Sequence, residues 1–493
     1  MSVEERVRCN KLKNKIMSPA EAATFVHAGD TLGVSGFTQS GYTKVVAGEL
    51  AKRAEAGEDL RLTVYTGASV GDAFDGVLTR AGALERRMPY QTNKDLRNAI
   101  NAGQIKYTDI PLSQVARWVR NGYLNHINVA IVEAVLIDEE GNIVPTTSVG
   151  ASETYVQCAD KVIVEINTRV PEALAGIHDI YSCKDYPNVE PINITKVNDR
   201  IGKPYIACDP DKIVAIVESD VLDGGVIEAV MDDEFRAMSD HLIGFLNKEV
   251  EAGRMPNPLP PLQAGIGAVS NAVLEGLVDS SFEHLTIYSE VMQQSMLDLI
   301  TAGKIDGASA TSIAVPANKL QDLYDKIDQY KDKVVLRPME ISNSAEVIHR
   351  LNVIAINTVI EADIYGNVNS TYVGGNRLMN GVGGSGDFCQ NAGTSIFITK
   401  STAKNGTISS IMPMVSHIDH DVKKVMVLIT EQGVADLRGL TMLERAEAII
   451  ENCAHPKFRQ QLRDYLKNAA EGTNYPAYPY NVELAQQYRR SMS

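Results

Sequence analysis

A glutamate that follows a predicted strand is the strongest candidate for chemistry in this sequence. The segment LTIYSEVM, which begins at Leu285, reads as a strand that ends just before Glu290. A carboxylate at the C-terminal end of a parallel strand lies where α/β sheets bind ligands. Glu290 is therefore the lead candidate for a residue that acts on a substrate, although a solvated glutamate at the start of a loop fits this segment equally well.

A glycine-rich loop is the second candidate. MNGVGGSGDF, from Met379, contains Gly381, Gly383, Gly384 and Gly386. The spacing matches GxGxxG, but a dinucleotide-binding loop opens a strand–turn–helix unit and has an acidic residue about 20 positions later, which this sequence lacks. Backbone N–H groups that no side chain shields can instead approach a carbonyl oxygen or a phosphate. A tight structural turn is the remaining alternative.

Three weaker patterns complete the set of candidates. QAGIGAVSNAV, from Gln263, is a glycine-rich start of a helix, whose N–H groups and dipole suit an anionic group. Lys404, in STAKNG, adds a cation, although a lone lysine is most often solvated. The segment SHIDHD holds His417, Asp419 and His420. Two histidines three residues apart in one short segment make a poor metal site, so a hydrogen-bonded structural histidine is expected instead.

The elements that must position these candidates belong to an α/β fold. Short β-branched runs at 60–67, 126–137, 159–167 and 211–219 read as buried strands and alternate with helical stretches. Continuous apolar strands separated by helices indicate a parallel sheet that is covered on both faces.

The chain also repeats itself, and the two copies differ at the candidate site. Four segments recur in the same order, which predicts two related open α/β domains with mainly parallel sheets. Where the second copy has Ser289-Glu290 after its strand, the first has Thr66-Gly67. The matched segments begin at Leu62 and Leu285, Ile100 and Ile300, Ile127 and Leu351, and Lys212 and Lys424.

The sequence also predicts the boundaries between the domains. An N-terminal α/β domain is predicted over 1–225, a connecting helix with a Pro-rich linker over 226–260, and a C-terminal α/β domain over 261–493. The second domain ends in a helical tail that opens with a capping box at Thr441 and runs to about Leu466. The last ~20 residues are expected to form a loose terminal strap.

Composition excludes several classes of protein. The 493 residues carry 47 basic and 62 acidic side chains, a net charge of −15, which argues against nucleic-acid binding. Six scattered cysteines without a CxxC motif suggest a reducing environment, so a cytoplasmic location is expected. No apolar run approaches the length of a membrane span, and no membrane partner is predicted.

The motifs together resemble class I CoA-transferases, in the acetyl-CoA hydrolase/transferase branch that includes succinyl-CoA:acetate and propionyl-CoA:succinate CoA-transferases. The resemblance covers nearly the whole chain. It rests on YSEVMQ around Glu290, GIGAV at 265–269, EISN ending at Asn343, NGVGGSGDF, SHIDH, and ITEQGVADLRG at 429–439.

The resemblance implies a role for each of these positions. Glu290 would be the nucleophile that becomes a glutamyl-CoA thioester, and Asn343 with the Gly384 N–H would polarise the reacting carbonyl. Glu431 would hold the nucleophile region in place. The acceptor pocket is expected to draw on GFTQSG, from Gly36, and PYQTN, from Pro89. The residues implied to contact CoA are Gly265, Ile266, Gly267, Ala268, Val269, Asn380, Gly384 and Lys404.

The expected function is transfer of CoA between short carboxylic acids by a ping-pong mechanism, with succinyl-CoA or propionyl-CoA and acetate or succinate as the substrates. A short acyl-CoA hydrolase that uses the same site is the first alternative, and a non-catalytic CoA sensor is the second. CoA and acyl-CoA enter as substrates, and neither a metal nor a permanently bound cofactor is expected. A homodimer is expected from the resemblance and from the frequency of symmetric oligomers among enzymes of this kind.

Overall fold

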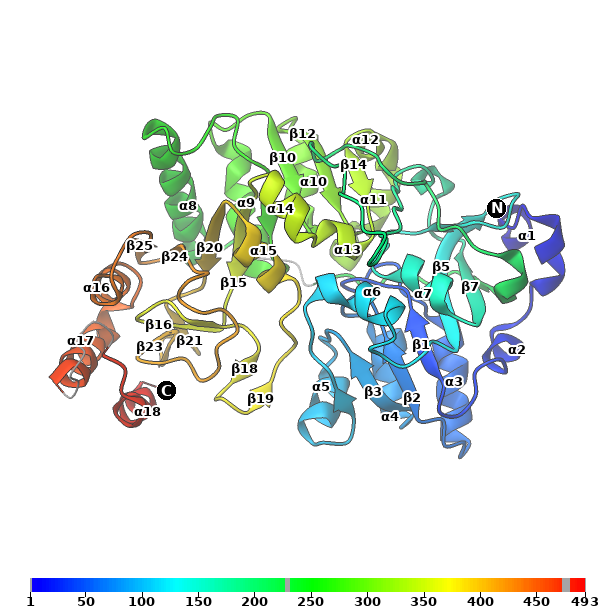
Figure 1. Cartoon of the computed structure of the whole chain (residues 1–493), viewed down its shortest axis with the longest axis horizontal. Helices are drawn as coiled ribbons and strands as arrows, with labels where there is room; N and C mark the ends of the chain where they lie inside the picture. The colour runs from blue at the N-terminus through cyan, green and yellow to red at the C-terminus, as the bar shows by residue number, and fades with distance from the viewer. Residues whose placement is uncertain (1, 227–230, 472–478, 493) are drawn as a thin grey trace.

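The computed structural model describes residues 2–226, 231–471 and 479–492, and two eight-stranded sheets form its framework (Figure 1). The first sheet has the order β4-β3-β2-β1-β5-β7-β8, with β6 paired to β5. Its only antiparallel pair among the described residues is β5 with β6. The strands are β1 (Thr31–Val34), β2 (Leu62–Tyr65), β3 (Leu84–Met88), β4 (Lys106–Tyr107), β5 (Val129–Ile137), β6 (Ile143–Pro145), β7 (Lys161–Asn167) and β8 (Ile213–Ser219).

The second sheet has the order β14-β12-β10-β9-β15-β20-β24-β25, and β25 runs antiparallel to β24 at its edge. Its strands are β9 (Leu262–Ala264), β10 (Leu285–Tyr288), β12 (Ile305–Ala310), β14 (Val334–Leu336), β15 (Ile354–Thr358), β20 (Thr394–Ile398), β24 (Val427–Thr430) and β25 (Gly433–Asp436).

The two strand orders correspond position by position, which confirms the duplication predicted from the repeated segments. Strand β2 matches β10, β5 matches β15, and β8 matches β24. The runs at 60–67, 126–137, 159–167 and 211–219 contain β2, β5, β7 and β8, as expected. The α/β class with mainly parallel sheets is therefore confirmed.

Helices cover both faces of the sheets. The central strand β5 shows this, because its residues are buried on both sides. All nine residues of β5 are buried. Val129 and Ile131 pack into the cluster on one face of the first sheet, while Ala130 and Val132 pack into the cluster on the other. The α-helices of the first half are α1 (Val3–Arg6), α2 (Pro19–Ala23), α3 (Val45–Glu55), α4 (Val77–Arg80), α5 (Lys94–Asn101), α6 (Leu112–Arg120) and α7 (Ser152–Cys158).

The second half carries more elements than the first. Its α-helices around the sheet are α9 (Ala268–Glu275), α10 (Gln294–Thr301), α11 (Leu320–Asp325), α12 (Ile327–Lys331), α13 (Met339–Ser342), α14 (Ala345–Arg350) and α15 (Ser385–Asn391). Its short strands are β11 (Val291–Met292), β13 (Ser312–Ile313), β16 (Glu361–Asp363), β17 (Val368–Asn369), β18 (Tyr372–Val373), β19 (Arg377–Leu378), β21 (Thr402–Ala403), β22 (Ile408–Ser409) and β23 (Ile411–Met412).

The connecting helix is α8 (Asp233–Glu251), and residues 227–230 before it lie outside the described ranges. Part of the first half reaches across to the second, because Asp179, in the long segment between β7 and β8, makes a buried ion pair with Arg337. The two halves therefore share contacts well beyond the linker, and the domain boundaries given above stay predictions. None of the helices in the described ranges combines the length and the apolar character that crossing a membrane requires.

The C-terminal tail differs from the expectation. Thr441 caps α16 (Met442–Asn452) with the predicted capping box, and α17 (Pro456–Glu471) extends past Leu466. The predicted loose strap is wrong for its second part, because α18 (Val482–Ser491) is a helix. The Asn481 side chain caps it, and Arg489 makes an ion pair with Glu361. Residues 472–478 of the expected strap lie outside the described ranges.

Candidate active site

A cavity of about 200 Å³ lies where the two halves meet, at the C-terminal ends of β10 and β15. Both halves supply its wall, as expected for a ligand site in an open α/β sheet. The lining residues are Phe37, Thr38, Ala68, Tyr90 and Leu112 from the first half, and Gly265, Ile266, Glu290, Val291, Asn357, Thr358, Val359, Ile360, Ser370, Asn380, Gly381, Val382, Gly383, Gly384 and Ser385 from the second.

Glu290 faces this cavity directly after β10. Its Oε1 accepts a hydrogen bond of 2.8 Å from Nδ2 of Asn343, the residue that ends α13. Burial, with a smaller contribution from the nearby Asp387 carboxylate, raises the pKa of Glu290 to about 7 against the opposing effect of the hydrogen bond from Asn343. A carboxylate that is partly removed from water and held by one amide donor is a stronger nucleophile than a fully solvated one.

Gly384 makes room for this arrangement. It lies at the N-terminus of α15, and a Cβ at this position would stand 1.8 Å from Oε1 of Glu290 and 2.2 Å from Nδ2 of Asn343. Any side chain would therefore displace the carboxylate, its amide partner, or both. The glycine-rich loop is thus used for close approach, as one of the two interpretations of the sequence predicted.

Asp387 forms the next layer of the site, and the sequence analysis did not select it. Its Oδ2 accepts from Nδ2 of Asn343 at 3.1 Å. From the first half, Ser113 donates its backbone N–H to Oδ2 at 3.1 Å and its hydroxyl to Oδ1 at 2.6 Å. Asp387 lies inside the motif NGVGGSGDF, so a signal existed, but its partner Ser113 is 274 positions away in the chain.

The first half also holds the glycine-rich loop from the opposite side. Nδ2 of Asn380 donates to the Tyr90 hydroxyl at 3.0 Å, and the Tyr107 hydroxyl donates to the Asn380 carbonyl at 3.1 Å. The Val382 N–H donates to both oxygens of Asp109, at 3.1 and 2.9 Å. Burial raises the pKa of Asp109 to about 7. None of these first-half partners except Tyr90, in PYQTN, belongs to a segment that the sequence analysis singled out.

The segment 265–269 lies beside the cavity. Gly265 and Ile266 line it, and Gly267 and Ala268 line an adjoining hollow that shares Thr38, Tyr90 and Ile266 with the cavity. Val269 packs against the core. The N-terminus of α9 is therefore close to the cavity, where its N–H groups could meet an anionic ligand.

Two of the predicted residues stand apart from the cavity wall. The described lining residues include neither Lys404 nor Glu431. Lys404 is exposed in the turn between β21 and β22. Glu431 follows β24 and accepts bonds from the Ser401 N–H at 2.8 Å and from the Ser401 hydroxyl, so it holds the loop after β20. A direct contact between Glu431 and Glu290 is not formed among the described residues.

His420 has the structural role that the sequence analysis favoured. It is buried, its Nε2 lies 2.9 Å from the Ser385 hydroxyl, and its ring stacks on Phe397. Burial lowers the pKa of His420 to about 4, so the ring is neutral. The Ser385 hydroxyl donates to the Val382 carbonyl at 2.9 Å, which leaves its oxygen to accept from His420 in the tautomer that carries Nε2–H. This chain of hydrogen bonds stiffens the glycine-rich loop.

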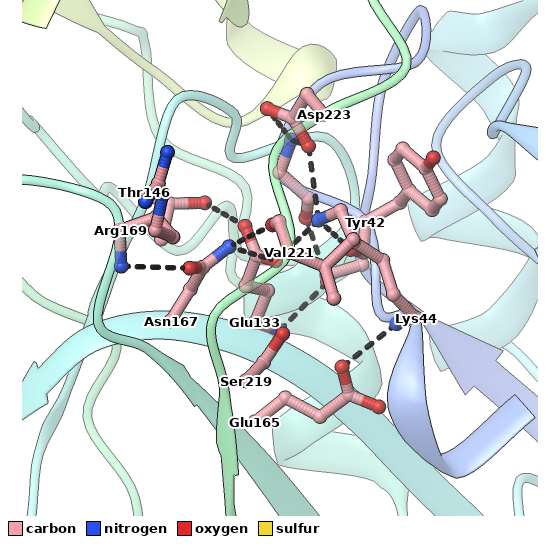
Figure 2. Close-up of polar contacts among 12 residues, drawn as sticks. Tyr42, Lys44, Glu133, Thr146, Glu165, Asn167, Arg169, Ser219, Val221 and Asp223 are labelled. Carbon is pink, nitrogen blue, oxygen red and sulfur yellow. Dashed lines mark hydrogen bonds and ion pairs between the residues drawn. The ribbon is translucent and has the colours of Figure 1, made fainter. Parts of the chain in front are cut away.

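The first half holds a buried cluster of charges around Lys44, which follows β1 (Figure 2). Glu133, which the strand register places at the position of Thr358 in β15, accepts from Lys44 Nζ at 2.5 Å. Asp223 lies 3.0 Å from the same Nζ and accepts from the Gly41 N–H at 3.2 and 3.1 Å. Burial alone lowers the pKa of an ammonium group, but Asp223 and Glu133 raise the pKa of Lys44 well above its usual value.

The Glu290 carboxylate and the Asn343 amide lie in a cleft between two duplicated α/β halves, an arrangement suited to an enzyme that uses a carboxylate as its nucleophile. Comparison with known proteins identifies the family. Residues 1–218 match the acetyl-CoA hydrolase/transferase N-terminal domain, and residues 320–466 match the acetyl-CoA hydrolase/transferase C-terminal domain. The chain belongs to the acetyl-CoA hydrolase/transferase family, as the resemblance implied.

Curated relatives of both activities are similar over most of the chain. A succinyl-CoA:acetate CoA-transferase of Clostridium kluyveri is 49% identical over 98% of this chain and 90% of its own length. A propanoyl-CoA:succinate CoA transferase of Escherichia coli is 42% identical, covering 92% of this chain and 94% of that protein. An acetyl-CoA hydrolase of Schizosaccharomyces pombe is 41% identical, covering 94% and 91%.

Solved structures share the fold. RipA from Yersinia pestis superposes with a TM-score of 0.73 at 22% identity, covering 95% of this chain and 99% of that one. A 4-hydroxybutyrate CoA-transferase from Porphyromonas gingivalis superposes with a TM-score of 0.65 at 21% identity, covering 93% and 98%. These similarities support the two-sheet architecture described above.

Proposed function

We propose that this enzyme transfers CoA between short-chain carboxylic acids and that Glu290 carries CoA between the two half-reactions as a glutamyl thioester. The observation that carries the proposal is the Glu290 carboxylate, which faces a cavity, is partly buried and is bonded to a single amide donor. Succinyl-CoA and propionyl-CoA as donors, and acetate and succinate as acceptors, are the pairs that the named relatives suggest.

The first half-reaction begins with a Glu290 oxygen attacking the thioester carbonyl of the acyl-CoA. The C–S bond breaks, which gives an acyl-glutamyl anhydride and CoA thiolate. The thiolate then attacks the glutamyl carbonyl, the anhydride C–O bond to the donor acid breaks, and the donor acid leaves as a carboxylate. Glu290 remains as a CoA thioester, and an acceptor carboxylate runs the same steps in reverse.

Each step passes through a tetrahedral oxyanion, and the site offers donors for it. Nδ2 of Asn343 lies 2.8 Å from the carboxylate oxygen that would develop the charge. Because Gly384 has no side chain, its backbone lies close to Oε1 of Glu290 and Nδ2 of Asn343. A preorganised donor of this kind contributes roughly 3–4 kcal/mol to the stabilisation of an oxyanion.

CoA would extend from the cavity toward the N-terminus of α9. The adjoining hollow, which Gly267 and Ala268 help to line, provides space for the pantetheine arm. Asn380 lines the cavity on the same side, so it lies where the pantetheine arm would pass. Lys404 lies further out and would meet the phosphates.

Hydrolysis of a short acyl-CoA at the same site is the second candidate, because acetyl-CoA hydrolases are among the similar proteins. Water and an acceptor acid would attack the same carbonyl, so an acceptor titration separates the two. A transferase forms a new acyl-CoA in proportion to added acetate or succinate, whereas a hydrolase releases free CoA at a rate that the acid does not change.

The test pairs Glu290→Ala with Glu140→Gln, which removes an exposed carboxylate far from the cavity. We expect Glu290→Ala to abolish transfer and Glu140→Gln to retain it, with acyl-CoA products measured by chromatography. Transfer that survives in Glu290→Ala at near wild-type rate would refute the proposal. A cytoplasmic location and a homodimer also remain predictions, and sedimentation of the purified protein tests the second.

A further inference from the structure

Some contact must fix which way the Asn343 side-chain amide faces, because the amide has hydrogen-bond donors on its nitrogen and an acceptor on its oxygen. Nδ2 directs its N–H groups to two carboxylates, Oε1 of Glu290 at 2.8 Å and Oδ2 of Asp387 at 3.1 Å. Oδ1 of Asn343 is buried and has no hydrogen-bond partner. The reverse orientation would place this oxygen against both carboxylates, which only accept hydrogen bonds when they are ionised.

Only one of these two carboxylates keeps its charge during the reaction. When Glu290 is an anhydride or a thioester, it is a neutral acyl group and attracts an N–H less strongly than a carboxylate does. Asp387 is not consumed at any step. Its hydrogen bond to Nδ2 of Asn343 therefore persists when the donor is needed at the glutamyl carbonyl.

Asp387 is in turn fixed by the first half of the chain. Ser113, in α6, donates to both of its oxygens through its backbone N–H and its hydroxyl. Asp387 is only 9% exposed, so no solvent competes effectively for these bonds. We propose that Asp387 is the positioning residue of this site, which keeps Nδ2 of Asn343 directed at the glutamyl carbonyl throughout turnover, with Ser113 locking Asp387 in place. This inference rests on the proposed function, since it assigns Asp387 a part in the reaction at Glu290.

Two substitutions at position 387 separate orientation from charge. Asp387→Ala removes the acceptor and leaves the Asn343 amide free to turn. Asp387→Asn can keep its oxygen at the place of Oδ2, where it accepts from Ser113 N–H and Asn343, while its NH2 group donates to the Ser113 hydroxyl. The conservative variant is therefore expected to preserve the orientation without the charge.

The measurement is the rate of glutamyl-CoA formation in a single turnover, followed by intact-protein mass. We expect Asp387→Ala to slow it by about 100-fold, the effect of losing one oxyanion donor, and Asp387→Asn by less than about tenfold. Ser113→Ala should lie between the wild type and Asp387→Ala. The affinity for CoA should change little in all three, because none of these side chains lines the cavity.

A pH profile adds a readout that a purely structural role would not change. The described groups that act on the charge of Glu290 are Asn343 and Asp387, and burial raises the pKa of Asp387 itself to about 6. Removing the negative charge of Asp387 lowers the pKa of Glu290, so the acidic midpoint of kcat/KM in Asp387→Asn is expected to move to lower pH.

Three results would overturn the assignment. They are a rate for folded Asp387→Ala close to that of the wild type, an Asp387→Asn rate as low as that of Asp387→Ala, and an unchanged pH midpoint in Asp387→Asn. If Asp387→Ala does not fold, the single-turnover rates of Asp387→Asn and Ser113→Ala, together with the pH midpoint of Asp387→Asn, test the assignment. A wild-type enzyme that forms no adduct would instead overturn the proposed function, and this assignment with it.

Discussion

The two halves of the chain place their sheets alike and use the resulting crevices in opposite ways. After β10 the second half has Glu290, and Gly384 leaves space for its carboxylate. After the matched strand β2 the first half has Gly67, where a Cβ would stand 2.7 Å from the Gly36 carbonyl oxygen. One crevice is therefore open around a carboxylate, and the other has no space for a side chain at the same position.

The two halves also differ in their buried charged groups. In the first half, Lys44 neutralises Glu133 and Asp223 in a buried cluster that ties the loop 36–41 to the segment after β8 (Figure 2). In the second half, Thr358 stands at the position of Glu133 and lines the cavity. Duplication thus supplied two crevices, and one of them serves stability while the other is available for chemistry.

The largest expected effect comes from filling the open crevice. In Gly384→Ala the new Cβ collides with Oε1 of Glu290 and Nδ2 of Asn343, so the nucleophile and its donor separate. We expect kcat to fall at least about 1,000-fold, because a misplaced nucleophile and a lost oxyanion donor combine. Steady-state kinetics of acyl transfer measure the effect.

The control is the matched glycine of the first half. Gly67→Ala meets backbone and the Phe37 ring, so it should lower the free energy of unfolding by about 1–3 kcal/mol, and it should reduce kcat far less than Gly384→Ala does because Glu290 and Asn343 stay in place. A loss of kcat in Gly67→Ala as large as that in Gly384→Ala would show that the two crevices do not differ as described.

The charge cluster offers the next largest effect. Lys44→Met leaves Glu133 and Asp223 buried without their cation, which should cost about 3–5 kcal/mol in the free energy of unfolding. Urea titration followed by circular dichroism measures it, with Lys52→Met, on the exposed side of α3, as the control. Equal stability of the two variants would contradict a structural role for the cluster.

The pH dependence gives a smaller effect. Since burial raises the pKa of Glu290 to about 7, the attacking carboxylate is present above that pH and is lost by protonation below it. At pH 6 the rate of the first half-reaction should be about a tenth of its plateau value above pH 8. The pH profile of kcat/KM for the acyl-CoA tests this, and a rate that stays flat from pH 5 to 8 would contradict the shielded environment of Glu290.

The smallest effect is expected at Lys404. An exposed lysine that meets a phosphate contributes a screened interaction, so Lys404→Ala should raise KM for acyl-CoA by about threefold, less at high salt, and leave kcat unchanged. The exposed Lys423 of the same half provides the matched alanine variant. An identical KM for the two variants would remove Lys404 from the CoA site.

Much of this asymmetry could be predicted from the sequence. The replacement of Thr66-Gly67 by Ser289-Glu290 and the presence of the glycine loop in one copy alone are local features that a comparison of repeats detects. The two related α/β halves followed from the same repeats, because each apolar run is long enough to identify a buried strand, whereas the order of the strands in each sheet came from the structure. These are properties that a short stretch of sequence carries by itself.

The parts that were missed depend on contacts between distant residues. The bond from Ser113 to Asp387 joins positions 274 apart, and no local pattern at Ser113 indicates its partner. Helix α18 was mistaken for a strap because ten residues form a marginal helix in isolation. It is stabilised by tertiary contacts such as the ion pair of Arg489 with Glu361, which a local pattern does not reveal.

The most direct test of the central claim is peptide mass spectrometry of the enzyme after incubation with succinyl-CoA or propionyl-CoA and no acceptor. Digestion at mildly acidic pH should yield a CoA adduct on the peptide that contains Glu290, and the adduct should disappear when acetate is added before the quench. An unmodified Glu290 peptide from an enzyme that has consumed the acyl-CoA would contradict the account and favour direct hydrolysis.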